Sequence, residues 1–296
     1  MTMMHFDDIS DNEIRIINRQ EAPRRPFYRR WWFWAAAVVI AAVAVVVIFG
    51  LSGKARQTAE TPQPGEVSEV ESTPTSPTEV VHEPAYVISS DTAVNDVPLT
   101  LYTPVNAVPE LMIGNPSEKD ESIVLAVQAA DIRADNREIL GSYVLKGELV
   151  SRGGGKKDGF CAILGGDIQL GVAENTDLFE KAIETGGYFF RQYPLVSEGI
   201  MIDNKPKGKT LRAALCELDG RMVVVRSRDD ESFHDFAQAL ADLGVNFAIN
   251  LVGSSHAYGF YREKSDDGST VSSSWGKLHT GAKNSNVNYI MWKARD

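Results

Sequence analysis

Three stretches of the chain combine charged, polar and glycine residues in an order that suggests a site for a phosphorylated ligand. They are GGYFFRQYPLV at Gly186 to Val196, KTLRAALCELDGRMVVV at Lys209 to Val225, and ALADLGVNFAINLVGSSHAYGF at Ala239 to Phe260. In the second stretch, Arg212 carries a planar guanidinium that is always charged and can bind two phosphate oxygens at once. The alternative interpretation is an ion pair in which Arg212 holds two strands together.

The third stretch contains a polar turn, Asn250 to Ser255, that offers further contacts to an anion. Gly253 lets the backbone approach a ligand closely, and Ser254 and Ser255 add hydroxyl and amide donors. His256 follows the turn, and a histidine is a candidate acid, base or metal ligand. The alternatives are a simple turn and a loop histidine without a chemical role.

The first stretch adds aromatic side chains after a pair of glycines. Tyr188, Phe189 and Tyr193 have flat apolar faces that can stack on a sugar ring. Aromatic residues at such a position can equally belong to the hydrophobic core, and both interpretations stay open.

Over roughly Lys146 to Trp292, these motifs resemble the phosphodiester glycosidase family. That family includes the uncovering enzyme, which removes N-acetylglucosamine from a sugar-phosphate diester, and many bacterial envelope proteins. Its motifs are an Asn-Gly-Gly-Phe-Phe-like turn, an arginine before a small apolar pair, and Asn-Leu-Asp-Gly-Gly-Gly-Ser. They correspond here to Thr185 to Phe190, Arg212 to Ala214, and Asn250 to Ser255. The resemblance implies that a sugar phosphate is bound by Arg212, Asn250, Gly253, Ser254, Ser255, Gly187 and Tyr188.

Two positions depart from the pattern of the family. Thr185 stands in place of the first asparagine, and Val252 stands in place of the aspartate of Asp-Gly-Gly. Cleavage of a glycosidic bond to phosphate builds positive charge at the sugar carbon, so it needs a carboxylate as base, nucleophile or electrostatic partner. Either the activity is lost, or another residue has taken over the role. The candidates are Glu184, Asp203, Asp167 and His256.

Other chemistries lack their motifs in this sequence. There is no G-x-S-x-G elbow, no Walker glycine loop and no H-E-x-x-H helix. The five histidines and two cysteines are scattered without ligand spacing, so we predict no metal site and no cofactor. The glycines at Gly153 to Gly155, followed by Lys156 and Lys157, lack the strand-to-helix context of a phosphate loop, which favours a flexible loop.

Most of the elements that must position these residues read as strands. The hairpin is the clearest feature, because Gly165 and Gly166 accept positive φ between two apolar-rich runs. The predicted strands are Tyr86 to Ile88, Leu99 to Val105, Ser122 to Ile132, Gly159 to Leu164, Asp167 to Val172, Gly199 to Asp203, Leu211 to Glu217, Met222 to Arg226, Val245 to Leu251 and Asn288 to Lys293.

Two segments show helical spacing of apolar residues. The first helix is predicted from Asn175 to Thr185, with Thr176 as its cap and Gly186 at its end. The second is predicted from about Phe233 to Leu243, capped by Ser232 and stopped by Gly244. Strands with a few packed helices predict an α+β domain with a mixed sheet, from residue 85 to 296.

A membrane anchor is predicted ahead of this domain. Trp31 to Leu51 is an uncharged run that spans the ~30 Å hydrocarbon core of a bilayer at ~1.5 Å per helical residue. Arginines crowd its N-terminal side, which predicts a cytoplasmic tail (1–30) and an exported, periplasmic C-terminal domain. A cleavable signal peptide is the alternative, but no convincing cleavage site follows the run.

The segment 52–84 is rich in Pro, Glu, Thr and Ser, which predicts a disordered, semi-extended linker. The net charge of the chain is −10, and no basic face indicates a nucleic-acid partner. The predicted partners are the lipid bilayer, through Trp31 to Leu51, and a sugar-phosphate or glycan ligand.

Cys161 and Cys216 both lie in apolar runs. An oxidising compartment permits a disulfide, whereas burial favours two free thiols, and the spacing does not decide between them.

The sequence therefore predicts a single-pass membrane protein with a phosphodiester-glycosidase-like domain that hydrolyses or binds a sugar phosphate of envelope glycans. The alternative is a catalytically degenerate glycan-binding or scaffold module of the cell envelope. Val252 is the residue that keeps the alternative open.

Overall fold

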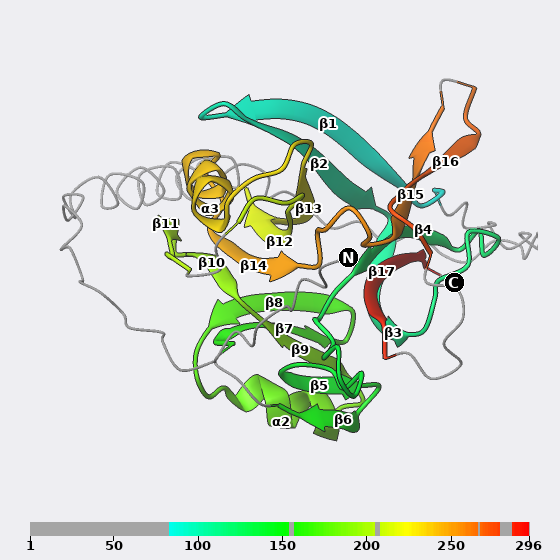
Figure 1. Ribbon diagram of the computed structural model, residues 1–296. Helices are drawn as coiled ribbons and strands as arrows, with labels where there is room; N and C mark the ends of the chain where they lie inside the picture. Colours follow the sequence, from blue (N-terminus) through cyan, green and yellow to red (C-terminus); the bar gives the residue numbers. More distant parts are fainter. Residues whose placement is uncertain (1–82, 154–156, 205–207, 266, 279–285, 296) are drawn as a thin grey trace, which may run out of the picture. The chain divides into compact units, whose positions relative to one another are not determined.

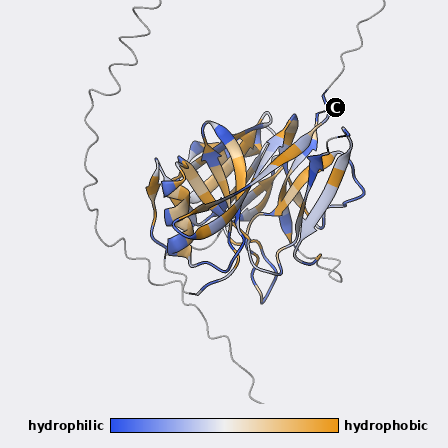
Figure 2. Cartoon of the chain, turned by 90° about the horizontal axis from the view of Figure 1, so that it is seen from above, coloured by the Kyte–Doolittle hydropathy of each residue, from blue (hydrophilic) through white to orange (hydrophobic). Residues whose placement is uncertain are grey.

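The described chain is built mainly of β-strands, which Figure 2 colours by hydropathy. Some strands, such as Ile123–Gln128, are buried along their whole length, whereas others, such as Glu148–Arg152, alternate between exposed and half-buried side chains. The computed structural model describes residues 83–153, 157–204, 208–265, 267–278 and 286–295. Their strands form two sheets, which Figure 1 shows one above the other.

The larger sheet has 12 strands and carries the Arg212 and Asn250 segments. Its neighbouring strands run antiparallel, except β1 and β15, which pair in parallel through Val87 and Glu263. In spatial order the strands are β11 (Ile200–Met201), β10 (Pro194–Ser197), β14 (Phe247–Leu251), β12 (Ala213–Leu218), β13 (Arg221–Ser227), β2 (Val97–Val105), β1 (Tyr86–Val94), β15 (Gly259–Lys264), β4 (Ile123–Gln128), β17 (Asn288–Ala294) and β3 (Ala107–Ile113), and β16 (Thr270–Trp275) pairs with β15.

The smaller sheet has five antiparallel strands and contains the predicted hairpin. Its spatial order is β6 (Glu148–Arg152), β5 (Ser142–Leu145), β9 (Tyr188–Gln192), β7 (Gly159–Leu164) and β8 (Asp167–Val172). Gly165 and Gly166 connect β7 to β8 with φ of 60° and 89°, so the hairpin prediction is confirmed.

The main core lies between the two sheets. Leu215 and Leu251 of the larger sheet belong to the same buried cluster as Tyr143, Cys161 and Phe190 of the smaller one. Each of these five side chains is buried, and such contacts between apolar side chains from both sheets are the dominant source of stability.

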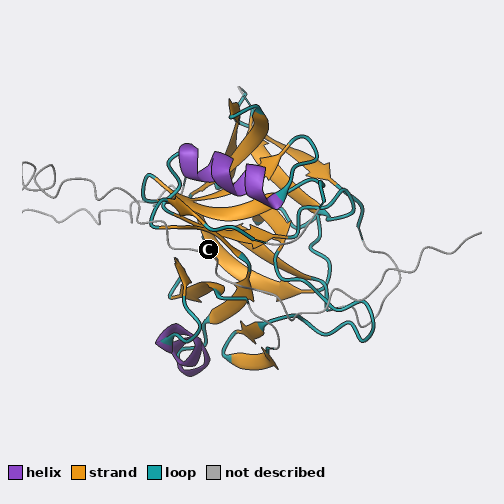
Figure 3. Cartoon of the chain, turned by 60° about the vertical axis from the view of Figure 1, so that its left-hand side comes forward, coloured by secondary structure: helices purple, strands orange, loops and turns teal. Residues whose placement is uncertain are grey.

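One helix covers the outer face of each sheet (Figure 3). Helix α2 (Asp177–Glu184) packs Ala182 against Phe160 and Phe189 of the smaller sheet. Helix α3 (Phe233–Asp242) packs Phe236 and Leu240 against the larger sheet. The described chain is therefore layered as helix, sheet, sheet and helix.

Both helix starts follow the predicted capping. The hydroxyl of Thr176 accepts a hydrogen bond from the amide of Leu178 at 3.3 Å, and that of Ser232 accepts one from Asp235 at 3.0 Å. These bonds satisfy amides that the first helical turn leaves unpaired. The two predicted helices and their caps are confirmed.

The predicted fold class is wrong. The described chain is mostly β, with two sheets and only two helices, rather than an α+β domain with one mixed sheet. The prediction missed several strands, among them β3, β5, β6, β15 and β16. Strands such as β6 and β16 expose most of their side chains and have no continuous apolar run, so their sequences resemble loops.

The predicted anchor falls outside the residues that the structure describes. The same is true of the tail (1–30), of the linker up to residue 82, and of the predicted loop between 154 and 156. Among the helices of the described residues, none is long and apolar enough to cross a bilayer.

The two cysteines are free. Cys161 is buried between the sheets, whereas Cys216 is buried on the opposite face of the larger sheet, under α3. Burial raises the pKa of both thiols, because the uncharged form is preferred away from water.

Candidate functional site

Two of the three sequence motifs meet at the end of neighbouring strands. Strands β12 and β14 are antiparallel, with Ala213 opposite Leu251 and Ala214 opposite Asn250. This register places Gly253 against the backbone of Arg212. A Cβ atom at Gly253 would lie 2.4 Å from the amide nitrogen of Ala213 and 2.7 Å from Cα of Arg212, so only glycine fits here.

Arg212 is buried, and backbone carbonyls hold its guanidinium. Nε donates to the carbonyl of Glu231 and Nη2 to the carbonyl of Gly208, both at 2.8 Å. The guanidinium also lies 4.3 Å from the centre of the Phe233 ring. Burial lowers the pKa of Arg212, and the nearby Asp230 opposes that shift. The side chain therefore holds the backbone at Gly208 and Glu231 and the start of α3 in place. These contacts are hydrogen bonds to carbonyls and a ring contact, not an ion pair that joins two strands.

The polar segment Asn250 to Ser255, which begins within β14, is held by three backbone contacts. The amide of Asn250 donates to the carbonyl of Tyr193 at 2.8 Å, and the amide of Val252 donates to the carbonyl of Gln128 at 3.1 Å. Gly253 rests on Arg212, as described above. We call the group formed by Arg212, Asn250, Gly253 and Ser254 the Arg212 corner.

The serines and the histidine of the turn differ in exposure. Ser254 is half-buried, whereas Ser255 and His256 are exposed to solvent. The carbonyl of Ser254 accepts a hydrogen bond from Ala257 at 2.9 Å, which closes the turn. The turn that follows Gly253 thus carries two hydroxyl groups and a histidine, all of them at least partly exposed to solvent.

Two aromatic rings connect the Arg212 corner to a second cation. Phe233 meets the ring of Tyr193 edge to face, with centres 6.1 Å apart. The Nζ atom of Lys157 lies 5.1 Å from the centre of the Tyr193 ring and 2.6 Å from a carboxylate oxygen of Asp131. Lys157 is buried, and the side chain of Asp131 is 33% exposed. A half-buried tyrosine therefore lies between the Arg212 corner and the Lys157–Asp131 pair.

Of the three residues predicted to stack on a sugar, Tyr188, Phe189 and Tyr193, only Tyr193 lies next to the Arg212 corner. Phe189 is fully buried and stacks on Phe160 in the core under α2. Tyr188 opens β9, five residues before Tyr193, and extended backbone rises ~3.3 Å per residue. Along the chain, Tyr188 therefore lies about 16 Å from Tyr193.

The Gly187 and Tyr188 motif has a structural role in the smaller sheet. The amide of Gly187 donates to Ala182 and its carbonyl accepts from Gly147, both at 2.8 Å. A Cβ at Gly187 would lie 2.7 Å from the carbonyl of Ile163. Tyr188 hydrogen-bonds Glu110, and burial, assisted by that carboxylate, raises the pKa of Tyr188 to about 12. The structure does not bring this motif to the Arg212 corner.

The three carboxylates considered as replacements for Val252 are exposed, and none is among the contacts of the turn. Glu184 ends α2, which packs on the smaller sheet, and Asp167 starts β8 of that sheet. Asp203 lies 3.4 Å from Nδ1 of His234.

Asp131 was not predicted, although it belongs to the loop that follows Gln128, the residue bonded to Val252. The sequence does contain a signal for Asp131, because this acidic residue directly follows the apolar run VLAVQAA.

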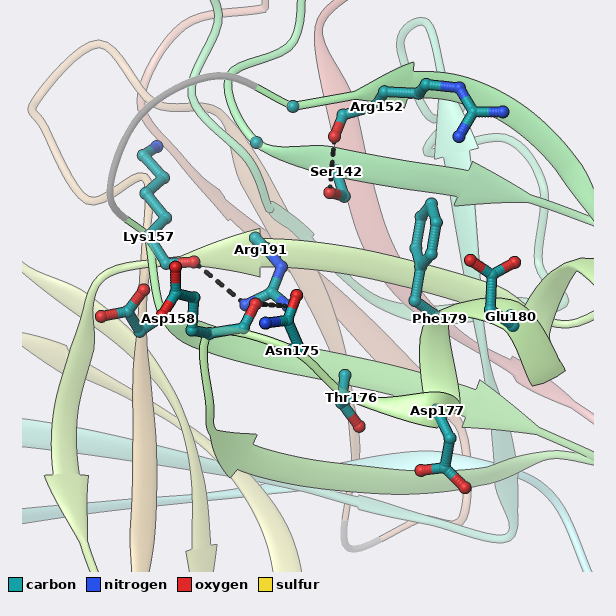
Figure 4. A pocket seen from close by; sticks show the side chains of 13 residues that line it. Ser142, Arg152, Lys157, Asp158, Asn175, Thr176, Asp177, Phe179, Glu180 and Arg191 are labelled. Atoms are coloured by element: carbon teal, nitrogen blue, oxygen red, sulfur yellow. Dashed lines mark hydrogen bonds between the residues drawn. The ribbon is translucent and has the colours of Figure 1, made fainter.

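A separate cavity of about 780 Å³ opens beside α2, and we call it the α2 cavity (Figure 4). None of the residues predicted to bind the sugar phosphate lines it. Its walls are Gly141, Ser142, Arg152, Gly153, Lys157, Asp158, Glu174, Asn175, Thr176, Asp177, Phe179, Glu180 and Arg191. Within the described residues, no three His, Cys, Asp or Glu side chains are grouped to hold a metal ion.

The chain matches no protein-family model and no curated protein. Among solved structures it is similar to the catalytic domain of zebrafish N-acetylglucosamine-1-phosphodiester alpha-N-acetylglucosaminidase, auto-inhibited by its pro-peptide. That similarity has a TM-score of 0.48 at 13% identity and covers 72% of this chain and 83% of the other.

A hypothetical protein from Synechocystis is similar with a TM-score of 0.44 at 15% identity, covering 71% of this chain and 62% of the other. Both similarities are too low to support a function, which must come from the residues of this chain.

Proposed function

We propose that the chain is a single-pass membrane protein whose exported domain binds a sugar phosphate of envelope glycans at the Arg212 corner. One observation carries the proposal: Gly253 rests on the backbone of Arg212, so the arginine motif and the polar turn share one place. The resemblance of these two motifs to phosphodiester glycosidases gives the ligand class.

The corner has complementary parts for such a ligand. Arg212 stays protonated despite its burial and gives the site a fixed positive charge. The half-buried Ser254 and exposed Ser255 supply hydroxyl donors for phosphate oxygens. Tyr193, whose ring contacts Lys157 and Phe233, adds an aromatic side chain beside these groups.

Binding without turnover is the form of the activity that the side chains support best. Val252 cannot donate a proton, accept one or stabilise a developing cation. Glu184, Asp167 and Asp203 are exposed elsewhere, as described above. A site that retains its anion-binding groups but has lost the acid keeps affinity and loses catalysis.

A second candidate function is hydrolysis with Asp131 as the carboxylate. A carboxylate oxygen of Asp131 lies 2.6 Å from Nζ of Lys157, and that Nζ lies 5.1 Å from the centre of the Tyr193 ring. A carboxylate can serve as a base or stabilise a cationic transition state.

A synthetic methyl diester of N-acetylglucosamine-1-phosphate distinguishes the two functions. We expect the full chain to bind the diester by calorimetry and to release no sugar. Ser254→Ala should weaken binding by up to about tenfold, the equivalent of one lost hydrogen bond. Ser90→Ala, at an exposed serine of β1, is the matched control and should bind like the wild type.

Three outcomes would contradict the proposal that the Arg212 corner binds the diester without hydrolysing it. Release of sugar that Asp131→Asn abolishes would establish the hydrolase. Absence of binding to the diester would refute the proposed ligand class. Equal affinities of the wild type and Ser254→Ala would place the ligand elsewhere.

The proposed topology has its own test. A reporter enzyme that folds only outside the cytoplasm, fused after Asp296, should be active. The same reporter fused directly after residue 30 should be inactive. Activity of the second fusion would contradict a cytoplasmic tail.

A further inference from the structure

The α2 cavity shares no residue with the Arg212 corner, and Lys157 of the cavity wall contacts Tyr193. Lys157 lines the cavity; its carbonyl accepts a hydrogen bond from Arg191, and its Nζ atom contacts Asp131 and Tyr193. At about 780 Å³ the cavity falls within the range of small-molecule sites, roughly 300–1,000 Å³. Its walls come from β5, β6, β9 and α2, together with the loop before α2.

The floor of the cavity is rigid. Nη1 of Arg191 donates to the carbonyls of Ala173 at 2.7 Å and Lys157 at 3.3 Å, and Nη2 donates to the carbonyl of Glu174 at 2.8 Å. These bonds tie the loop before α2 to β9. Arg191 thereby holds the cavity open as a structural residue rather than as a free anion receptor (Figure 4).

The polar groups around the floor are exposed and mixed in type. Asp158, Glu174 and Glu180 present carboxylates, Asn175 an amide and Arg152 a guanidinium. The fourth carboxylate, that of Asp177, pairs with Lys181 at 2.6 Å. The wall therefore offers both donors and acceptors of hydrogen bonds, with no excess of positive charge to attract an anion.

An aromatic ring completes the wall. Phe179 is half-buried: its ring contacts Phe189 edge to face at 5.3 Å and also borders the cavity (Figure 4). An aromatic face beside planar acceptors and donors matches a pyranose ring, whose C–H face is apolar and whose edge carries hydroxyls.

We propose that the α2 cavity binds an uncharged oligosaccharide of two or three units, with one sugar stacked on Phe179. Glu180, Asn175 and Asp158 accept or donate hydrogen bonds to the hydroxyls. A phosphate or sulfate would face three carboxylates and be repelled. The site is separate from the Arg212 corner and does not require that the corner bind a sugar phosphate.

The full chain, purified in a detergent without a sugar headgroup, tests the proposal by saturation-transfer NMR. The probes are cellotriose, maltotriose, mannotriose and chitotriose at millimolar concentration. We expect at least one of them to bind. Phe179→Leu keeps the apolar packing but removes the flat face, and it should weaken binding by about tenfold. Glu180→Gln should weaken it by roughly threefold.

Glu184→Gln, on the same helix but outside the cavity, is the matched control and should leave binding unchanged. The proposal is overturned if no trisaccharide binds the wild type, or if Phe179→Leu and Glu180→Gln bind as tightly as Glu184→Gln. Preference for a sulfated trisaccharide over its uncharged parent would overturn the assigned ligand class.

Discussion

Arg212 illustrates how the partners of a side chain decide what it does. Its type alone fits a phosphate ligand, but its Nε and Nη2 atoms donate to two loop carbonyls and its plane lies over Phe233. The guanidinium therefore contributes to stability as well as to the charge of the corner. The two roles are separable by experiment, because a lysine keeps the charge and loses the fork.

Arg212→Lys should lower the free energy of unfolding by about 1–3 kcal/mol, since at least one buried carbonyl loses its donor. Denaturant unfolding measures the change. Arg228→Lys is the matched control, because Arg228 is exposed and pairs with Asp91 at the surface, where such pairs contribute little. Equal stability of Arg212→Lys and the wild type would show that the carbonyls find other donors.

Two tyrosines allow a second test at the same scale. Burial raises the pKa of Tyr289 to about 12, and its hydroxyl has no hydrogen-bond partner among the described residues. Tyr188 reaches about the same pKa, but it hydrogen-bonds Glu110. Because both pKa values are raised on folding, each neutral tyrosine contributes stability below pH ~10 that is lost as the pH rises towards about 12.

Tyr289→Phe should keep or increase stability at pH 7, since it removes an unpaired buried hydroxyl. It should also reduce the loss of stability between pH ~10 and 12. Tyr188→Phe should lose about 0.5–1.5 kcal/mol at pH 7 along with its hydrogen bond. Thermal unfolding of both variants across this pH range provides the measurement. A large loss at pH 7 in Tyr289→Phe would reveal a partner for its hydroxyl.

The elements of this chain differ in how strongly local residues specify them. The β7–β8 hairpin and both helices carry their own start and stop signals in Gly165–Gly166, Thr176 and Ser232. Strands β6 and β16 do not, because most of their side chains face solvent. Such strands depend on pairing with a neighbour, which no short sequence window contains.

The cap of α3 gives the prediction at this scale. Ser232→Ala should lower the free energy of unfolding by about 1 kcal/mol, because the amide of Asp235 loses its acceptor. Ser232→Asp should retain most of the stability, since aspartate also caps helices. If alanine and aspartate are equally destabilising, the effect comes from packing and not from the cap.

At the scale of the described domain, two sheets enclose a central core, and each helix packs on the outer face of one sheet. Phe190 is fully buried between the sheets, with Tyr143 and Cys161 beside it in the same cluster. The larger sheet carries the Arg212 corner, while the smaller sheet carries the α2 cavity. Contact between the sheets therefore determines how these two regions lie relative to each other.

Phe190→Ala should cost about 3–5 kcal/mol, as expected for an aromatic side chain removed from a packed core. Chemical denaturation with both near-UV and far-UV dichroism measures the loss. Ile200→Ala is the control, because Ile200 is 58% exposed and its truncation should change stability by less than about 0.5 kcal/mol. A small effect at Phe190 would mean that the sheets do not rely on this contact.

The sequence by itself determined the helices, their caps and the glycine hairpin. Each of these depends on residues a few positions apart, whose steric and hydrogen-bonding preferences are local. The motifs also indicated a class of ligand through their resemblance to a family. That resemblance predicted that both Tyr188 and Arg212 bind the ligand, and it could not tell which of them lies at the same place as the other motifs.

Only the tertiary structure decided which candidates share a site. Strand register puts Gly253 on Arg212 and Tyr193 beside Asn250, while Tyr188 lies at the far end of β9. It also brings in Asp131, which lies far from these motifs in the sequence. Such pairings join strands that are distant along the chain, so they depend on the packing of two sheets and not on local preference.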